Sequence, residues 1–231
     1  MDLIKNISIY EAVLTSFKSN QLDCNMELFK AVSAELDNLK SELAYKNAKA
    51  NNNGNIQKAM QKLLKNSTKI NSANKSLHNA WVDNEYTYAT NGYMLVRCIS
   101  DMVELPLIED EALKPKLSGY FQGCIECNTT IELPTLSELK SNIKACKEKS
   151  KLAGLYSSKR TIVINMQGFV CNAEYLLIAL EALPEAIGVT KKSDRFSNPL
   201  FISSDNIDCG ILPINYKRDL SELSNFECFL I

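Results

Sequence analysis

The sequence is poor in the residues on which most enzyme sites depend. It has one histidine, His78, and eight glycines among 231 residues. A single histidine excludes any mechanism that takes two histidines from this chain, and so few glycines leave little material for a phosphate-binding loop. The motifs GxxxxGK[ST], GxGxxG, GxSxG and HExxH are all absent. The sequence therefore predicts a protein that is not an enzyme and binds no cofactor.

The chain also has no excess of positive or negative charge and no long apolar run. The formal net charge is −1, so the chain as a whole has no electrostatic attraction to nucleic acid or to a membrane. No apolar run approaches the roughly 18 residues that a membrane-spanning helix needs. The start, MDLIKNISIYEAV, lacks the basic segment and long apolar core of a secretory signal. We expect a cytoplasmic protein with no membrane contact.

Cysteine is plentiful but poorly spaced for metal binding. The eight cysteines are Cys24, Cys98, Cys124, Cys127, Cys146, Cys171, Cys209 and Cys228. Only Cys124 and Cys127 have the spacing of zinc ligands, and no second such pair or histidine pair completes a set of four. We therefore expect reduced thiols, mostly buried as small apolar side chains, and no metal.

The first fifty residues predict two helices. Ser8 and Glu11 have the spacing of a capping box at the start of the first helix. A second helix, about 26–48, carries apolar residues at alternating spacings of three and four, which is a coiled-coil-like pattern. These are Phe29, Val32, Leu36, Leu39 and Leu43. The pattern fits a helical hairpin that packs on itself or on the next domain, and it also fits a dimerisation seam.

A small, polar segment, KNAKANNNGN at 46–55, predicts a linker between domains. We therefore expect an N-terminal helical hairpin over 1–50, an α+β domain over 51–218 and a C-terminal tail over 219–231.

The α+β domain is expected to begin with a helix at about 55–66 and three antiparallel strands. The strands, roughly 77–82, 85–90 and 93–99, are joined at Asp83-Asn84 and Asn91-Gly92. Asn-Gly is the strongest short-range hairpin signal and predicts a type I′ turn, with positive φ at both central residues.

The rest of the domain predicts a second unit of the same kind. Residues 119–127 resemble a strand, Thr135 can cap a helix that runs to about 150, and 160–172 reads as two strands that turn at Gly168. A helix over 173–183, capped by Asn172, precedes three short strands. These are 187–191, 200–203 and 210–214. A helix followed by a meander thus occurs twice, at 55–99 and at 173–214.

Three segments resemble the bacterial DNA sliding clamp, the β subunit of DNA polymerase III. They are YATNGYMLVR (88–97), GFVCNAEYLLIALEAL (168–183) and NPLFISSDNIDCGILPINY (198–216), in the order that the family uses. Asn91 stands where the family usually has Asp, and Leu212 stands where clamps put Met before Pro213. The resemblance covers about 55–216 and implies a DNA-clamp-like fold of helices packed on antiparallel meanders, in a short version with one clamp domain.

The resemblance also implies a function. We expect a processivity factor of phage or mobile-element DNA replication that binds duplex DNA without sequence specificity. A DNA polymerase or a clamp loader would be its partner, and one clamp domain per chain could close a ring only as a homo-oligomer. The alternatives are a self-associating protein-interaction module that uses the fold without encircling DNA, and a small enzyme of unrecognised type.

Lysines on two predicted helices are the candidate DNA-binding residues. They recur at spacings of four and three, which places each set on one helical face. The two sets are Lys58, Lys62, Lys65 and Lys69, and Lys140, Lys144, Lys147 and Lys151. Clamps turn such lysines toward phosphates, but lysines also fill the exposed faces of ordinary helices. The helix over 173–183 has Glu174 and Glu181 and no lysine, so a uniformly basic wall is not expected.

Overall fold

The computed structural model describes most of the chain. The described residues are 2–19, 25–71, 73–115, 117, 119–121, 127–157, 160–190, 198–216 and 224–231. Among these residues, no helix is long and apolar enough to cross a membrane.

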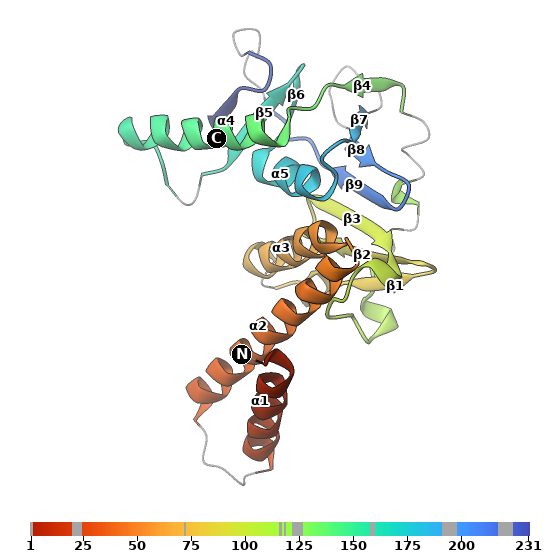
Figure 1. Ribbon diagram of the computed structural model, residues 1–231. Coiled ribbons are helices and arrows are strands. Elements are labelled where there is room, and N and C mark those ends of the chain that lie inside the picture. The colour runs from red at the N-terminus through yellow and green to blue at the C-terminus, as the bar shows by residue number, and fades with distance from the viewer. Residues whose placement is uncertain are drawn as a thin grey trace.

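The described part contains five α-helices and ten strands, which together make a mixed α+β fold with antiparallel sheets (Figure 1). The helices are α1 (Leu3–Lys18), α2 (Met26–Ala50), α3 (Gly54–Ile70), α4 (Leu136–Leu152) and α5 (Ala173–Ala182). The strands are β1 (Trp81–Asp83), β2 (Tyr86–Thr90), β3 (Met94–Ile99), β4 (Thr129–Ile131), β5 (Ile162–Met166), β6 (Phe169–Asn172), β7 (Ile187–Thr190), β8 (Leu200–Ser203), β9 (Ile207–Ile211) and β10 (Cys228–Leu230).

The helix starts follow capping chemistry, with one correction. Thr135 accepts the backbone N–H of Glu138 at 3.2 Å, and Asn172 accepts that of Glu174 at 2.8 Å, as expected. The predicted capping box at Ser8 is wrong. The first helix starts at Leu3, because the Asp2 side chain accepts the backbone N–H groups of Ile4 and Lys5. Ser8 is a residue of this helix and not its cap, and its hydroxyl donates to the Ile4 carbonyl.

The linker expected at 46–55 is also wrong. Helix α2 continues to Ala50, and α3 begins only four residues later at Gly54. The three asparagines between them form a tight turn in which Asn52 has a positive φ of 62° and the Asn53 N–H donates to the Ala48 carbonyl. Asparagine tolerates this left-handed conformation, so the polar run turns the chain sharply. Helices α2 and α3 consequently pack against each other.

In the seven-stranded sheet, the two three-stranded meanders lie side by side in opposite strand order. Its strands run β1-β2-β3-β9-β8-β7, with β4 added at the far edge beside β7. Helix α3 precedes the meander β1-β2-β3, and α5 precedes the meander β7-β8-β9. The last strands of the two units, β3 and β9, pair antiparallel at the centre, and α3 packs beside α5. The expected repeat of a helix and a three-stranded meander is therefore confirmed.

The hairpin between β2 and β3 has a different turn from the predicted one. Asn91 and Met94 close the turn, and positive φ occurs at Gly92 (86°) but not at Asn91. The second central residue, Tyr93, does not have a positive φ, and positive φ at the first central residue alone distinguishes a type II′ turn from type I′, so the type I′ prediction is wrong. The fully buried Asn91 instead accepts the N–H groups of Tyr93 and Met94 and donates to Asn66 of α3 at 2.8 Å.

The other expected strands are mostly confirmed. Strands β5 and β6 turn at Gln167-Gly168, and β7 and β8 lie at their predicted positions, whereas β9 begins at Ile207, three residues before the predicted start at 210. The strand expected over 119–127 is not formed in the described part of that range, where residues 120–121 make a 3-10 turn, and β4 begins only at Thr129. Strand β10, from the segment expected to be a tail, pairs with β5 in a second sheet of order β10-β5-β6.

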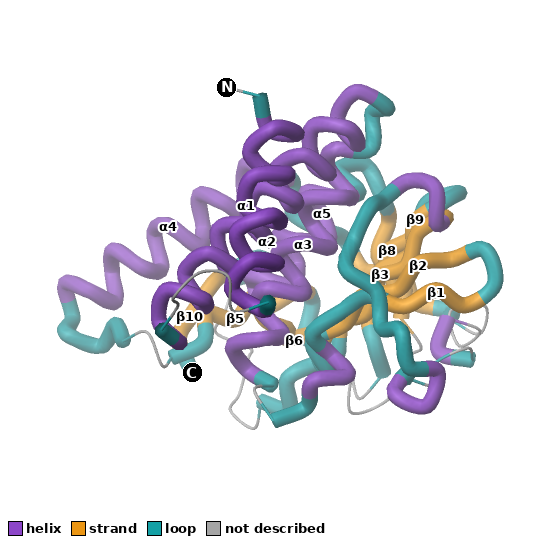
Figure 2. The backbone as a smooth tube through the Cα atoms, turned by 90° about the horizontal axis from the view of Figure 1, so that it is seen from below, coloured by secondary structure: helices purple, strands orange, loops and turns teal. Residues whose placement is uncertain are grey.

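The main core lies between the helices and the sheets. Figure 2 shows the helices gathered on one side of the molecule and the large sheet on the other. Apolar residues of α3 and α5, such as Met60, Leu63 and Leu176, are fully buried there. The opposite face of the seven-stranded sheet is covered by a smaller aromatic cluster that includes Trp81, Tyr88, Phe121 and Phe201. Apolar clusters thus pack on both faces of the large sheet.

Candidate nucleic-acid interface

Four helices form one layer, in the order α2, α3, α5, α4. Each of these helices packs on the next, and α3 and α5 also contact the sheets beneath. Helix α5 is the most enclosed, because only Glu174, Leu177 and Glu181 escape full burial along it. The two predicted lysine sets lie on α3 and α4, so α5 separates them.

The lysines of α3 lie on its exposed side. Lys58, Lys65 and Lys69 are exposed, and Lys62 is partly covered. The helix extends to Ile70, so Lys69 lies within it. Among the described residues, Lys58, Lys65 and Lys69 have no ion-pair partner. These three side chains are therefore available to a negatively charged ligand.

The lysines of α4 are also outside the core but are more involved in local contacts. Lys144 lies 3.9 Å from Glu148 of the same helix, and Lys147 lies 3.8 Å from Glu174 of α5. The ammonium group of Lys151 lies 5.5 Å from the centre of the Tyr156 ring. Exposed pairs of this kind contribute little to stability and do not hold a lysine in place.

Glu181 of α5 forms an ion pair with one lysine from each of the two sets. One carboxylate oxygen pairs with Lys62 of α3 and the other lies 3.4 Å from Lys140 of α4. Burial of Glu181 disfavours its charged form, but hydrogen bonds and the charges of Lys62 and Lys140 outweigh it and hold the pKa below its ordinary value. Glu181 is therefore ionised at neutral pH and neutralises part of the lysine charge on this face.

The structure thus brings the eight predicted residues onto one helix layer but does not make them a uniform basic surface. Lys62, Lys140 and Lys147 each pair with a glutamate of α5. The candidate lysines that pair with no glutamate of α5 lie on α3 and α4, the two helices that flank α5. A contact through this face would involve phosphates rather than bases, because an ammonium group attracts phosphate without reading sequence.

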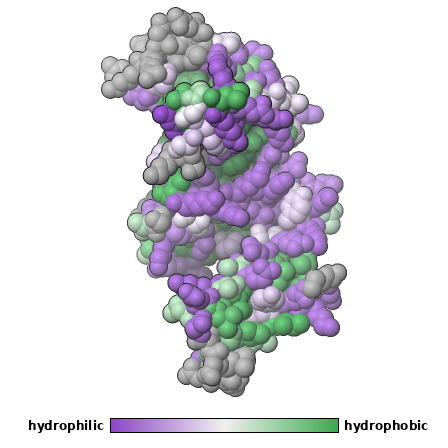
Figure 3. Space-filling model, turned by 90° about the vertical axis from the view of Figure 1, so that its left-hand side faces the viewer, coloured by the Kyte–Doolittle hydropathy of each residue, from purple (hydrophilic) through white to green (hydrophobic). Residues whose placement is uncertain are grey.

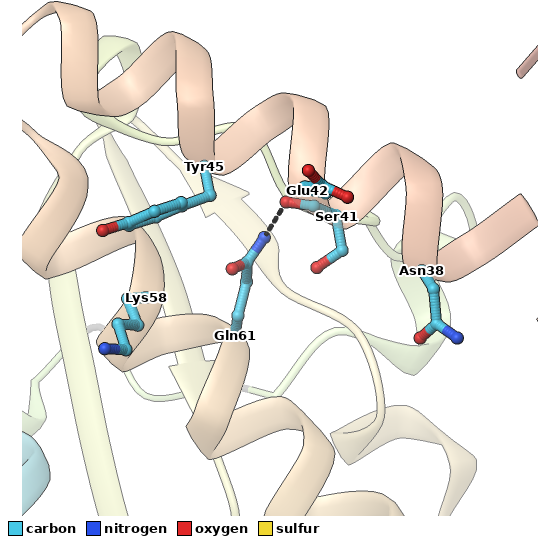
Figure 4. A pocket seen from close by; sticks show the side chains of 6 residues that line it. All are labelled: Asn38, Ser41, Glu42, Tyr45, Lys58 and Gln61. Atoms are coloured by element: carbon cyan, nitrogen blue, oxygen red, sulfur yellow. Dashed lines mark hydrogen bonds between the residues drawn. The ribbon is translucent and has the colours of Figure 1, made fainter. Parts of the chain in front are cut away.

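A polar groove between α2 and α3 was not predicted from the sequence. It has a volume of about 320 Å³ and is lined by Asn38, Ser41, Glu42, Tyr45, Lys58 and Gln61. Figure 4 shows Gln61 of α3 reaching across to the Ser41 carbonyl of α2, a hydrogen bond of 2.9 Å. The lining comes from both sides of the expected linker, so only the close packing of the two helices creates this groove.

Metal and thiol chemistry receive no support from the described residues. Within them, no group of three or more His, Cys, Asp or Glu side chains is placed to hold a metal ion, and Cys124 lies outside them. Burial raises the pKa of the Cys98 and Cys228 thiols to about 12, and it also raises the pKa of Cys171 and Cys209. These thiols stay protonated at neutral pH and are poor nucleophiles.

Comparison with known proteins gives little further identification. The sequence matches no protein-family model and no curated protein. Among solved structures, the chain is similar to the Helicobacter pylori β clamp bound to a DNA ligase peptide, with a TM-score of 0.30 and 17% identity. The match covers 56% of this chain and 40% of the clamp chain. A likeness this weak does not establish a shared fold.

Proposed function

We propose that this chain is a non-enzymatic, clamp-like processivity factor of phage or mobile-element DNA replication. The observation that carries the proposal is the duplicated unit of one helix and a three-stranded meander. The two units meet at the β3–β9 pair and place α3 beside α5. This arrangement coincides with the three sequence segments that resemble sliding clamps. A DNA polymerase or a clamp loader is the expected partner of such a protein.

The proposed contact with duplex DNA uses the exposed face of the helix layer. Lys58, Lys65 and Lys69 on α3, with Lys144 and Lys151 on α4, are exposed there. Lysines that neutralise phosphates release counterions, so binding would be independent of sequence and would weaken steeply as salt rises. The negative charge of Glu174 and Glu181 limits the strength of this contact.

The second candidate is a protein-interaction module that uses the same fold without encircling DNA. The observation that favours it is the pairing of Lys62, Lys140 and Lys147 with the two glutamates of α5. A face that neutralises its own lysines is less suited to DNA than a uniformly basic one.

The experiment that separates these candidates is DNA binding across a salt series. The test variant is Lys58→Glu/Lys65→Glu/Lys144→Glu, and the matched control on the helical hairpin is Lys5→Glu/Lys18→Glu/Lys30→Glu. All six side chains are exposed, so both triple variants should fold, which circular dichroism would check.

We expect the test variant to lose DNA binding and the control to keep most of it. If the two variants lost DNA binding equally, the lysines of the helix layer would contribute only as general surface charge. No binding by the parent protein, or equal retention on circular and linear DNA, would favour the interaction module.

A further inference from the structure

The N-terminal hairpin of α1 and α2 has an incompletely buried apolar seam. Each helix carries a heptad-spaced set of apolar or aromatic residues, and the two helices pack on each other. The sets are Leu3, Ile7, Tyr10, Leu14 and Phe17 on α1, and Phe29, Val32, Leu36, Leu39 and Leu43 on α2. Of these ten residues only Leu36 is buried, at 7% exposure, and α1 has no buried residue at all. Two helices alone do not cover this seam.

Apolar side chains also flank the seam. Ile4 of α1 is 65% exposed, and Met26 and Leu28 of α2 are 68% and 45% exposed. They occupy the e or g positions beside the heptad seam, which two-stranded coiled coils usually fill with charged residues. Helices of a larger bundle place apolar residues there, because a further helix covers those positions. Figure 3 shows apolar surface gathered at the lower end of the molecule, where the hairpin lies.

The hairpin stands away from the rest of the molecule. Figure 1 shows α1 and the first half of α2 projecting from the body, while the later part of α2 packs on α3. The residues of α2 that this packing helps to bury are Ala44 and Ala48, near its C-terminal end. Helix α1 packs on α2, and an exposed ion pair of 2.7 Å between Glu11 and Lys40 joins them at the surface. The hairpin is therefore a pair of packed helices with apolar surface left exposed to a partner.

The charge of the hairpin indicates which partner fits. Residues 1–50 contain six lysines and seven acidic residues, so the segment is nearly neutral. It has no excess positive charge with which to hold nucleic acid, and no strong charge that calls for an opposite one. In a two-fold interface each patch meets a copy of itself, and a strongly charged patch would repel its copy. A nearly neutral, apolar patch is suited to a second copy.

We propose that the hairpins of two chains pack together as a four-helix bundle and make the protein a dimer. The bundle buries the half-exposed seams of both hairpins, together with Ile4, Met26 and Leu28. Short antiparallel hairpins are the halves from which such bundles are built. The candidate DNA-binding lysines lie on α3 and α4 and not on the hairpin, so this interface does not depend on the proposed DNA contact.

The test is the molar mass of the full-length protein in solution, measured by light scattering over a range of concentrations. The variant is Ile4→Glu/Met26→Glu, which introduces four carboxylates into the proposed bundle. Both positions lie in the first turn of a helix, where the helix dipole favours a negative charge, so the hairpin itself should stay helical. The matched control is Leu113→Glu/Ile187→Glu, at two exposed apolar residues outside the hairpin.

We expect the parent and the control to have twice the chain mass of 25.9 kDa and the hairpin variant to have the chain mass, with unchanged circular dichroism. In the parent, hydrogen exchange of the α1 amides should slow as concentration rises. A parent that is monomeric at every concentration, a hairpin variant that remains dimeric, or α1 exchange that is independent of concentration would overturn the proposal.

Discussion

Gly92 holds the tip of the β2–β3 hairpin in a conformation that other residues adopt poorly. Its φ is 86°, and a Cβ added there would meet its nearest neighbour, Leu77 Cδ1, at an ordinary 3.9 Å. The constraint therefore comes from the backbone and not from crowding. Replacing Gly92 by Val should lower the free energy of unfolding by about 1–3 kcal/mol, as measured by urea denaturation.

Tyr93 provides the control for this substitution. It occupies the second central position of the same turn, is 56% exposed and does not have a positive φ. Tyr93→Val should therefore be tolerated better than Gly92→Val. Equal losses from the two variants would mean that turn geometry does not set the cost.

Gly210 is constrained for a different reason, which is the close approach of an aromatic ring. A Cβ at this position of β9 would lie 2.5 Å from Tyr120 Cε1. Tyr120 packs edge-on against Phe121 and Phe201 on the outer face of the sheet, with ring centres 5.3 and 5.7 Å away, so its ring has little room to move. Gly210→Ala should destabilise the protein by about 1–3 kcal/mol through overpacking.

A double-mutant cycle isolates this contact. Tyr120→Ala alone should destabilise the protein because it removes an aromatic packing partner. In the double variant the added methyl group no longer meets the ring, so Gly210→Ala should cost less there than in the parent. Additive losses would show that the strain lies elsewhere.

At the scale of elements, the ion pairs of Glu181 with Lys62 and Lys140 connect α5 to α3 and to α4. Because its pKa is below the ordinary value, folded Glu181 binds a proton less readily than unfolded Glu181. The resulting stabilisation is present above the unfolded pKa and is lost as pH falls through the folded pKa. Glu181→Gln should lower the free energy of unfolding by about 1 kcal/mol at neutral pH and by less in acid.

Urea denaturation of the parent and Glu181→Gln at neutral and acidic pH checks this expectation. Glu174→Gln is the matched control, because Glu174 is a more exposed glutamate of the same helix and contacts one lysine at 3.8 Å. A stability difference that stays constant across the pH range would mean that the charge of Glu181 does not hold the helices together.

At the scale of the whole molecule, the same two glutamates bear on the proposed DNA contact. Glu174→Gln/Glu181→Gln removes two negative charges from the middle of the helix layer and frees Lys62, Lys140 and Lys147. If this layer meets phosphates, the double variant should bind duplex DNA more tightly than the parent and show a steeper dependence on salt. The measurement is the DNA dissociation constant across a salt series.

The control for the whole-molecule prediction is Glu27→Gln/Glu35→Gln, which removes the same charge from exposed positions on α2 of the hairpin. An equal gain from both double variants would indicate a general charge effect. Unchanged binding in the Glu174→Gln/Glu181→Gln variant would place any DNA contact away from the helix layer.

The sequence alone determined the elements whose signals are local. Asn172 and Thr135 start their helices where capping chemistry predicts, and the repeat of helix and meander follows from hydrophobic periodicity and turn residues. The lysine spacing likewise placed each set on one face of its helix. These signals depend on residues a few positions apart, so they do not need the rest of the fold.

Only the tertiary structure decided how distant elements meet. The asparagines of 51–53 could be a linker or a turn, and the packing of α2 on α3 made them a turn. Asn91 takes its role from Asn66, 25 residues away, and Glu181 pairs with Lys62, 119 residues away. Hydrogen bonds and ion pairs depend on distance in space, which the order of residues does not contain, so these contacts exist only once the helices are stacked.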